Sequence, residues 1–273
     1  MQTSTESMTS HVGTRAGYQT RALSRALAIL DLFDEETRVL SVKAMHVRLG
    51  IPKPTIVRLA SLLASEGYLR REDGGYAIGA KTLHLGSLYV RHNDFMRLCR
   101  APLEALAGEA SQTASLAKLV GQRIVHLVVA PSPRPVQHVK RAGTMGLPHA
   151  TGVGKAILSA LPAERIDQIL DQEPYPTCTT KTIRTRAALL AELERVRRVG
   201  FAIDDEETAF GLRCCAIPIA VDDGDPTAIS VSGPAGEFTD SAIADFVGSL
   251  RRAAALVAAA VAGTENYPTV TGS

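Results

Sequence analysis

The stretch SVKAMHVRLGIPKPTIVRLASLLASEGYLRREDGGYAIG, residues 41–79, decides the fold of the first third of the chain. Ser41 is a good helix N-cap and Gly50 a good helix stop, so a short helix is expected between them. Another helix should follow almost at once, because Pro52 and Pro54 suit the first turn of a helix, where a missing N–H costs little. The two helices are therefore joined by a tight turn.

Two short extended segments, 68–71 and 76–78, flank the turn sequence DGG at 73–75. This arrangement is typical of a β-hairpin. Upstream, residues 22–33 carry apolar side chains at helical spacing and predict a first helix. Helix, helix, tight turn, helix and hairpin follow one another in the order of a winged helix-turn-helix.

The helix after Pro52 has two different faces. At 100° per residue, Ile56, Leu59, Ala60 and Leu63 cluster on one side, and the opposite side is small, polar and basic. A face of the second kind fits the major groove of DNA. The alternative is an ordinary three-helix core whose basic face is solvated; the tight turn and the hairpin favour DNA binding.

The charge distribution is compatible with an anionic partner for this segment. Residues 21–97 hold 12 basic and 8 acidic residues, whereas residues 98–273 hold 17 and 19. An excess of four positive charges is modest, so a solvated basic face would explain it as well.

The composition is that of an ordinary soluble globular protein, with 273 residues of which 45% are apolar and 21% charged. The longest mostly apolar stretch, 253–262, is far shorter than the roughly 20 residues that span a bilayer, so no membrane association is expected. The first residues lack the pattern of a signal peptide. The four cysteines have no C-x-x-C spacing, and we expect free thiols in a cytoplasmic protein.

The remainder of the chain alternates between helical and extended patterns. A connecting helix is expected over 80–97. Further helices are expected over 102–110, 151–160, 162–170, 186–199 and 243–261. Strands are expected over 114–120, 123–130, 136–140, 201–203, 213–221 and 227–232. Strand pairs with helices beside them predict an α+β domain built on an antiparallel sheet.

The segment HATGVGKAIL, residues 149–158, does not match a phosphate-binding P-loop. His149 and Ala156 stand where that motif needs glycine and a hydroxyl residue. The segment does offer a loop at a helix N-terminus, whose free N–H groups suit a small anion. A plain helix start with close packing at its glycines is the alternative.

Several other residues are candidates for chemistry. The acidic run 204–207 predicts a solvated loop, or paired carboxylates for acid–base work that no nucleophile, lysine or metal cluster accompanies in sequence. Ser230 and Ser232 lie two apart on a predicted strand and so face the same side. Cys214 and Cys215 are adjacent, so only one is expected to point inward. The scattered histidines do not support a metal site, and no cofactor is expected.

Six stretches together resemble the isocitrate-lyase-regulator (IclR) family of bacterial transcription factors over about residues 20–262. They are ALSRALAILDLF (22–33), LGIPKPTIVRLASLLASEGYLRR (49–71), HATGVGKAIL (149–158), RRVGFAIDDEE (197–207), GLRCCAIPI (211–219) and AISVSGPAGEFT (228–239). The resemblance implies a winged helix-turn-helix over 21–79, a linker helix over 80–97, and an effector domain with a GAF/profilin-like sheet over 98–263. A disordered tail, 1–20, and a second tail, 264–273, complete the expected organisation.

The resemblance also implies roles for particular residues. Those expected to bind DNA are Arg25, Ser41, Lys43, Lys53, Thr55, Arg58 and Arg71. Those expected to face an effector are Gly152, Val153, Asp204, Cys214, Ser230 and Ser232. Pro54 departs from the small hydroxyl residue that is common in the family at its position.

We therefore expect a cytoplasmic transcriptional regulator without enzymatic activity. It would bind double-stranded operator DNA, respond to a small organic acid, and form dimers or tetramers. The alternative from another class is a small-molecule-processing enzyme, or a metabolite sensor, with an accessory basic domain.

Overall fold

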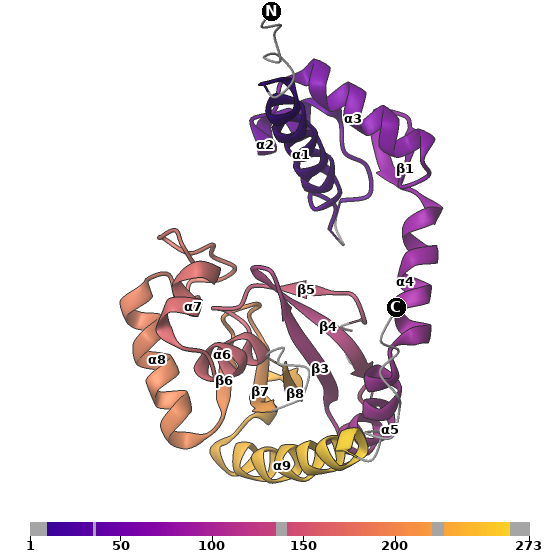
Figure 1. Cartoon of the computed structure of the whole chain (residues 1–273). Coiled ribbons are helices and arrows are strands. Elements are labelled where there is room, and N and C mark those ends of the chain that lie inside the picture. Colours follow the sequence, from indigo (N-terminus) through magenta and orange to yellow (C-terminus); the bar gives the residue numbers. More distant parts are fainter. Residues whose placement is uncertain (1–9, 35–36, 135–140, 220–226, 263–273) are drawn as a thin grey trace, which may run out of the picture. The chain divides into compact units, whose positions relative to one another are not determined.

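The computed structural model describes residues 10–34, 37–134, 141–219 and 227–262. The chain divides into two compact units, one up to residue 92 and one from residue 93 (Figure 1). The expected tail 264–273, the expected strand 136–140 and the first nine residues of the expected tail 1–20 lie outside the described residues.

The first unit has the element order that the sequence predicts. Its elements are α1 (Ser10–Leu30), α2 (Val42–Leu49), α3 (Lys53–Ser65), β1 (Leu69–Glu72), β2 (Gly75–Ile78) and α4 (Ala80–His92). The Ser41 hydroxyl accepts a hydrogen bond from the Ala44 N–H at 3.1 Å, and Gly50 ends α2 in the left-handed conformation. These two caps confirm the short helix and the tight turn that leads into α3.

The core of this unit lies beneath α3. Ile56, Leu59 and Ala60 are buried, as the helical wheel predicts, and they belong to a cluster that includes Met45 and Leu69. β1 and β2 pair antiparallel, which confirms the hairpin.

Helix α1 is longer than expected. It begins at Ser10, so the expectation of a disordered tail is wrong from that residue onward. Once the segment 22–30 is helical, each preceding residue adds one backbone hydrogen bond at little nucleation cost, and no proline interrupts residues 10–21.

The expected single linker helix over 80–97 is two helices. α4 ends at His92, and α5 (Asp94–Ala110) begins after Asn93. The Asn93 side chain accepts a hydrogen bond from the Met96 N–H at 3.0 Å, so it acts as the N-cap of a new helix. Asn93 is also where the second compact unit begins.

The second unit is built on one antiparallel sheet. Its strands are β3 (Thr113–Val120), β4 (Arg123–Ala130), β5 (Met145–Gly146), β6 (Ala202–Asp205), β7 (Leu212–Ile219) and β8 (Thr227–Pro234), in the spatial order β5-β4-β3-β8-β7-β6. The predicted strands at 114–120, 123–130, 201–203 and 227–232 are confirmed within a few residues, and so is the strand expected at 213–221, whose last two residues lie outside the described ones. The two-residue β5 was not expected.

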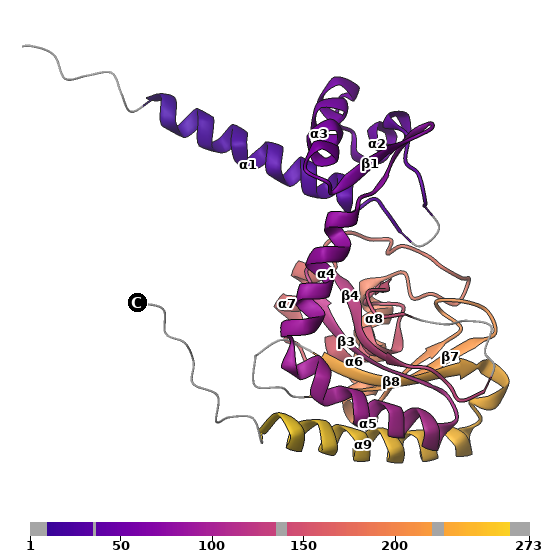
Figure 2. The same ribbon diagram turned by 90° about the vertical axis from the view of Figure 1, so that its right-hand side faces the viewer.

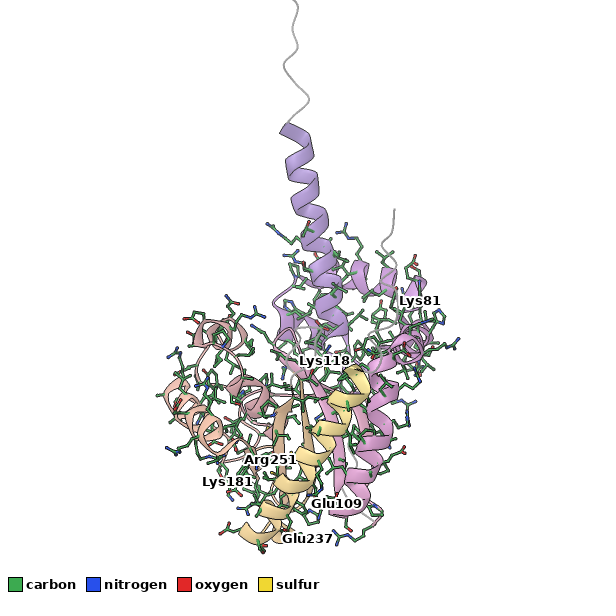
Figure 3. The ribbon with its side chains drawn as sticks, turned by 60° about the horizontal axis from the view of Figure 1, so that its bottom comes forward. Lys81, Glu109, Lys118, Lys181, Glu237 and Arg251 are labelled. Atoms are coloured by element: carbon green, nitrogen blue, oxygen red, sulfur yellow. The ribbon has the colours of Figure 1, made fainter. Side chains whose placement is uncertain are left out.

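Helices cover both faces of this sheet. α5 and α9 (Asp240–Ala262) run side by side across one face (Figure 2), where Leu103 and Leu250 pack against Leu116 and Ile229. Glu109 lies near the end of α5 (Figure 3) and pairs with Arg252 of α9.

The other face is covered by α6 (Gly152–Ser159), whose Val153 and Ala156 pack against Ala216 and Ala228. α7 (Ala163–Ile169) and α8 (Arg186–Val199) complete this side. The α+β class, with its N-terminal helix-turn-helix and C-terminal antiparallel sheet, is thereby confirmed.

Candidate functional site

The outer face of α3 carries the residues expected to read DNA. Pro52 is the N-cap and Lys53 the first helical residue, so Lys53 projects from the N-terminal end of the helix. Lys53 and Arg58 are exposed, and Thr55 is half-buried between them. The departure at Pro54 costs no intrahelical hydrogen bond, because the N–H groups of the first turn have no partner inside a helix.

Three arginines converge on a hollow between α1 and α3. Arg21, Arg25 and Arg58 line it together with Thr55. Arginine side chains gathered in this way suit a phosphate group, which accepts several N–H donors at once. Arg21 was not among the expected DNA contacts, although its i,i+4 spacing from Arg25 places both on one side of α1.

Arg71 of the hairpin contacts the side of α3. Its Nη2 donates to the Ser61 hydroxyl at 2.9 Å, and its guanidinium lies 5.4 Å from the centre of the Tyr76 ring. Ser61 and Tyr76 hydroxyls are also within 3.1 Å of each other. Arg71 therefore braces the hairpin against α3 while its side chain stays exposed.

Ser41 and Lys43 lie at the start of α2. The Ser41 oxygen is occupied as the helix cap, which leaves its O–H proton available to a phosphate oxygen. Lys43 is exposed.

In the second unit, the expected effector residues meet on the sheet face that α6 covers. Cys214 of β7 pairs with Asp204 of β6 on one side and with Ser232 of β8 on the other. Ser230 lies two residues from Ser232 and so points to the same face. All four side chains are buried.

The N-terminus of α6 approaches this row closely. A Cβ on Gly152 would lie 2.9 Å from the Cys214 sulfur, and one on Gly154 would lie 2.2 Å from the Pro148 carbonyl oxygen. The close packing considered as the alternative for these glycines is therefore present. It also brings the N-terminus of α6 to the polar face; there the Thr151 hydroxyl caps the helix and accepts from the Gly154 N–H at 3.1 Å. Val153 is buried in the apolar cluster, so only its backbone is in a position to contact a ligand.

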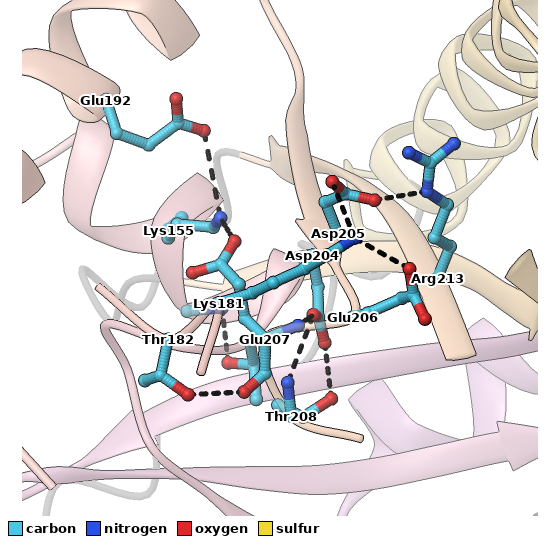
Figure 4. A network of polar contacts seen from close by, with 12 residues as sticks. Lys155, Lys181, Thr182, Glu192, Asp204, Asp205, Glu206, Glu207, Thr208 and Arg213 are labelled. Carbon is cyan, nitrogen blue, oxygen red and sulfur yellow. Dashed lines mark hydrogen bonds and ion pairs between the residues drawn. The ribbon is translucent and has the colours of Figure 1, made fainter. Parts of the chain in front are cut away.

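Asp204 is occupied by its own loop. Its carboxylate accepts from the Glu207 N–H at 2.7 Å, from the Thr208 N–H at 3.3 Å and from the Thr208 hydroxyl at 2.5 Å (Figure 4). It therefore orders the loop that follows β6.

The acidic run is not the solvated loop that its composition suggests. Asp204 and Glu207 are buried, and Glu207 forms a hydrogen-bonded ion pair with the buried Lys155 of α6 (Figure 4). Glu192 of α8 lies 3.7 Å from the same ammonium. Burial raises the pKa of the Glu207 carboxyl, and the charge of Lys155 opposes that rise. Sequence spacing gave no sign of this pair, because 52 residues separate its members.

Both adjacent cysteines are buried, so the expectation that only one points inward is wrong. Cys214 faces α6, and Cys215 belongs to the cluster beneath α5 and α9. The reason is that helices cover both faces of the sheet. Burial raises the pKa of the Cys215 thiol and raises that of Cys99 to about 12, so neither is a reactive thiolate.

The described part of the chain holds neither a metal-binding cluster nor a membrane-spanning helix. No group of three or more His, Cys, Asp or Glu residues there is placed to hold a metal ion. Within the same residues, no helix is both long and apolar enough to cross a bilayer.

Comparison with known proteins assigns both units. Residues 22–73 match the IclR helix-turn-helix domain, and residues 87–259 match the C-terminal domain of bacterial IclR transcriptional regulators. The chain belongs to the IclR family. This regulator is 29% identical to the transcriptional repressor IclR of Escherichia coli over 90% of its own length and 91% of the relative's. It is 32% identical to the regulator BhcR of Paracoccus denitrificans over 83% of each chain.

A solved IclR homologue from Microbacterium hydrocarbonoxydans, complexed with 4-hydroxybenzoate, shares the fold. The TM-score is 0.67 at 21% identity, and the match covers 89% of this regulator and all of that chain. The curated relatives of this IclR family member are transcriptional regulators and not enzymes.

Replacing Lys155 with Met should lower the free energy of unfolding by about 3–5 kcal/mol, because a buried carboxylate loses its counter-ion. Lys181→Met is the matched control. Lys181 is 42% exposed and pairs with Asp205 and Glu206 at the surface, so its loss should cost about 0–1 kcal/mol. Urea unfolding of the three proteins measures both values. Equal losses of unfolding free energy in the two variants would show that the buried Lys155–Glu207 pair stabilises the fold no more than a surface pair does.

Proposed function

We propose that this IclR family member is a cytoplasmic, ligand-responsive regulator. It binds double-stranded operator DNA through α3 and the β1–β2 hairpin, and it binds a small organic acid between the N-terminus of α6 and the β7–β8 face. It works as a dimer or a tetramer. One observation carries the effector part: a row of buried polar side chains lies directly under a helix N-terminus.

The DNA part rests on the geometry of the first unit. Lys53, Thr55 and Arg58 lie on the outer side of α3, where a recognition helix presents residues to the major groove. Arg25, Ser41, Lys43 and Arg71 surround that helix and would contact phosphates. In this division of labour, phosphate contacts fix the register of the protein, and base contacts specify the sequence.

The effector part rests on complementary chemistry. The first N–H groups of α6 and its dipole favour a carboxylate, and the hydroxyls of Ser230 and Ser232 supply further donors. The Asp204 carboxylate accepts three hydrogen bonds from its own loop, and as an acceptor it offers no donor to the carboxylate of a ligand. The solved homologue with 4-hydroxybenzoate supports an acid that carries a second oxygen, such as a hydroxy- or keto-acid.

Oligomer formation rests on α4. No residue of this helix is buried, and it exposes Leu83, Leu85, Tyr89 and Val90 to between 46% and 76%. Large apolar side chains gathered on one exposed helix mark an interaction surface. A second copy of the chain is the expected partner, since two recognition helices are needed to read two half-sites of an operator.

Arg58→Ala should weaken binding to the operator by about 1–3 kcal/mol if Arg58 contacts a guanine edge, with a smaller effect on random DNA. Arg71→Ala should weaken binding about equally on all sequences and flatten its salt dependence. Fluorescence anisotropy measures the affinity of each variant for DNA from upstream of the gene and for scrambled DNA. A uniform loss in both variants would refute base reading by Arg58.

Ser230→Ala combined with Ser232→Ala should abolish the response to effector and leave operator affinity nearly unchanged, because these serines belong to the second unit. A thermal-shift screen of organic acids supplies the effector, since a ligand that binds only the native state raises its stability. If the double variant still binds that acid with unchanged affinity, the effector site lies elsewhere.

Sedimentation of the full chain at micromolar concentration should give at least twice the 29.0 kDa of one chain. Leu83→Glu with Val90→Glu should shift the protein toward the monomer, because charges would replace apolar contacts. His84→Glu with Arg91→Glu is the control, with the same spacing one position along α4. A monomer with and without operator DNA would contradict the proposal.

A further inference from the structure

Three buried polar side chains, joined in a row by hydrogen bonds, cross the sheet beside the proposed effector site. The Ser115 hydroxyl of β3 lies 2.9 Å from the Ser230 hydroxyl of β8, and Nδ1 of His126 of β4 lies 3.1 Å from the Ser115 hydroxyl. The exposed fractions of Ser115, Ser230 and His126 are 0%, 0% and 2%. Neither Ser115 nor His126 was singled out from the sequence.

The strand register places these three side chains on one face of the sheet. Ser115 is directly opposite Ser230 in the β3–β8 pair, and Ala117, two residues further along β3, is opposite His126 in the β3–β4 pair. Ser115 and Ala117 therefore point to the same side as Ser230 and Ser232. The neighbouring residues Leu116 and Ile229 point to the opposite side, into the core beneath α5 and α9.

The hydrogen bonds that join these three side chains all run in one direction, because each serine hydroxyl holds a single proton. When Nδ1 of His126 carries a proton, it donates to Ser115, Ser115 donates to Ser230, and the Ser230 proton is left for a further acceptor. When Nδ1 is bare, the order reverses and Ser230 presents only lone pairs. Ser230 can therefore donate to a keto oxygen in one arrangement and accept from a hydroxyl in the other.

We propose that Ser115 and His126 determine effector specificity by positioning the Ser230 hydroxyl. That hydroxyl then recognises a second oxygen, hydroxyl or keto, on an acid whose carboxylate is bound at the N-terminus of α6. Ser230 and Ser232 are about 7 Å apart along the strand, which suits two oxygens of one small molecule. The inference rests on the effector site proposed above and adds the residues that select among acids.

The test compares matched acids that differ by one oxygen. Isothermal titration calorimetry on the full chain uses benzoate against 4-hydroxybenzoate, and propanoate against lactate and pyruvate. In at least one set, the unmodified protein should bind the acid with the additional hydroxyl or keto oxygen about tenfold more tightly than the plain acid. Ser115→Ala and His126→Phe should reduce that ratio to about twofold or less and leave the affinity for the plain acid nearly unchanged.

Two variants separate positioning from packing. Ser115→Thr keeps the hydroxyl and should retain most of the ratio. Ser249→Ala makes the same change at a buried serine of α9, whose hydroxyl donates to the Asp245 carbonyl, and should leave the ratio intact. A thermal melt of each variant verifies that it is folded.

The outcomes are distinguishable. If Ser115→Ala keeps the full ratio, or weakens both members of a set equally, the specificity role is overturned while the effector site stands. If none of the acids binds the unmodified protein at millimolar concentration, the proposed effector class fails, and the specificity role fails with it.

Discussion

A buried ion pair between Lys155 and Glu207 holds helix α6 onto the sheet, and the geometry of the candidate effector site depends on it. The ammonium and the carboxylate are both removed from water, so the loss of Lys155 leaves an uncompensated carboxylate in the interior. The pair joins α6 to the loop after β6, which the Asp204 carboxylate orders. Strand β6 in turn pairs with β7, where Cys214 lies opposite Asp204. Small shifts of α6 would therefore separate its N-terminal N–H groups from the polar face.

The parts of the molecule that follow from local patterns could be predicted from the sequence. Ser41, Gly50 and the DGG turn act through neighbours within a few residues, and the elements they delimit are where the sequence puts them. The break at Asn93 was missed, because an N-cap inside a continuous helical pattern depends on where the second unit starts to pack. The Lys155–Glu207 pair was missed for a related reason: proximity across 52 residues is created by the fold alone. Both cysteines are buried because helices cover both faces of the sheet. The alternation of side chains along one strand does not reveal that second layer of helices.

The two units use different physical means for their proposed tasks. The first concentrates arginines around the hollow between α1 and α3, where each adds a charge-assisted donor for a phosphate. The second places hydroxyls and helix N–H groups in a buried setting, where a hydrogen bond is worth more than it is in water. Membership of the IclR family accounts for the pairing of such units in one chain, while the choice of effector depends on a few side chains on a single sheet face.

The central claim is that the N-terminus of α6 and the β7–β8 face together form one ligand site. Amide hydrogen exchange of the full chain, with and without the acid that gives the largest thermal shift, tests it most directly. The account predicts that the acid slows exchange most strongly in peptides covering residues 150–156, 204–216 and 227–234. Slower exchange confined to α5 and α9, with those three segments unchanged, would contradict it.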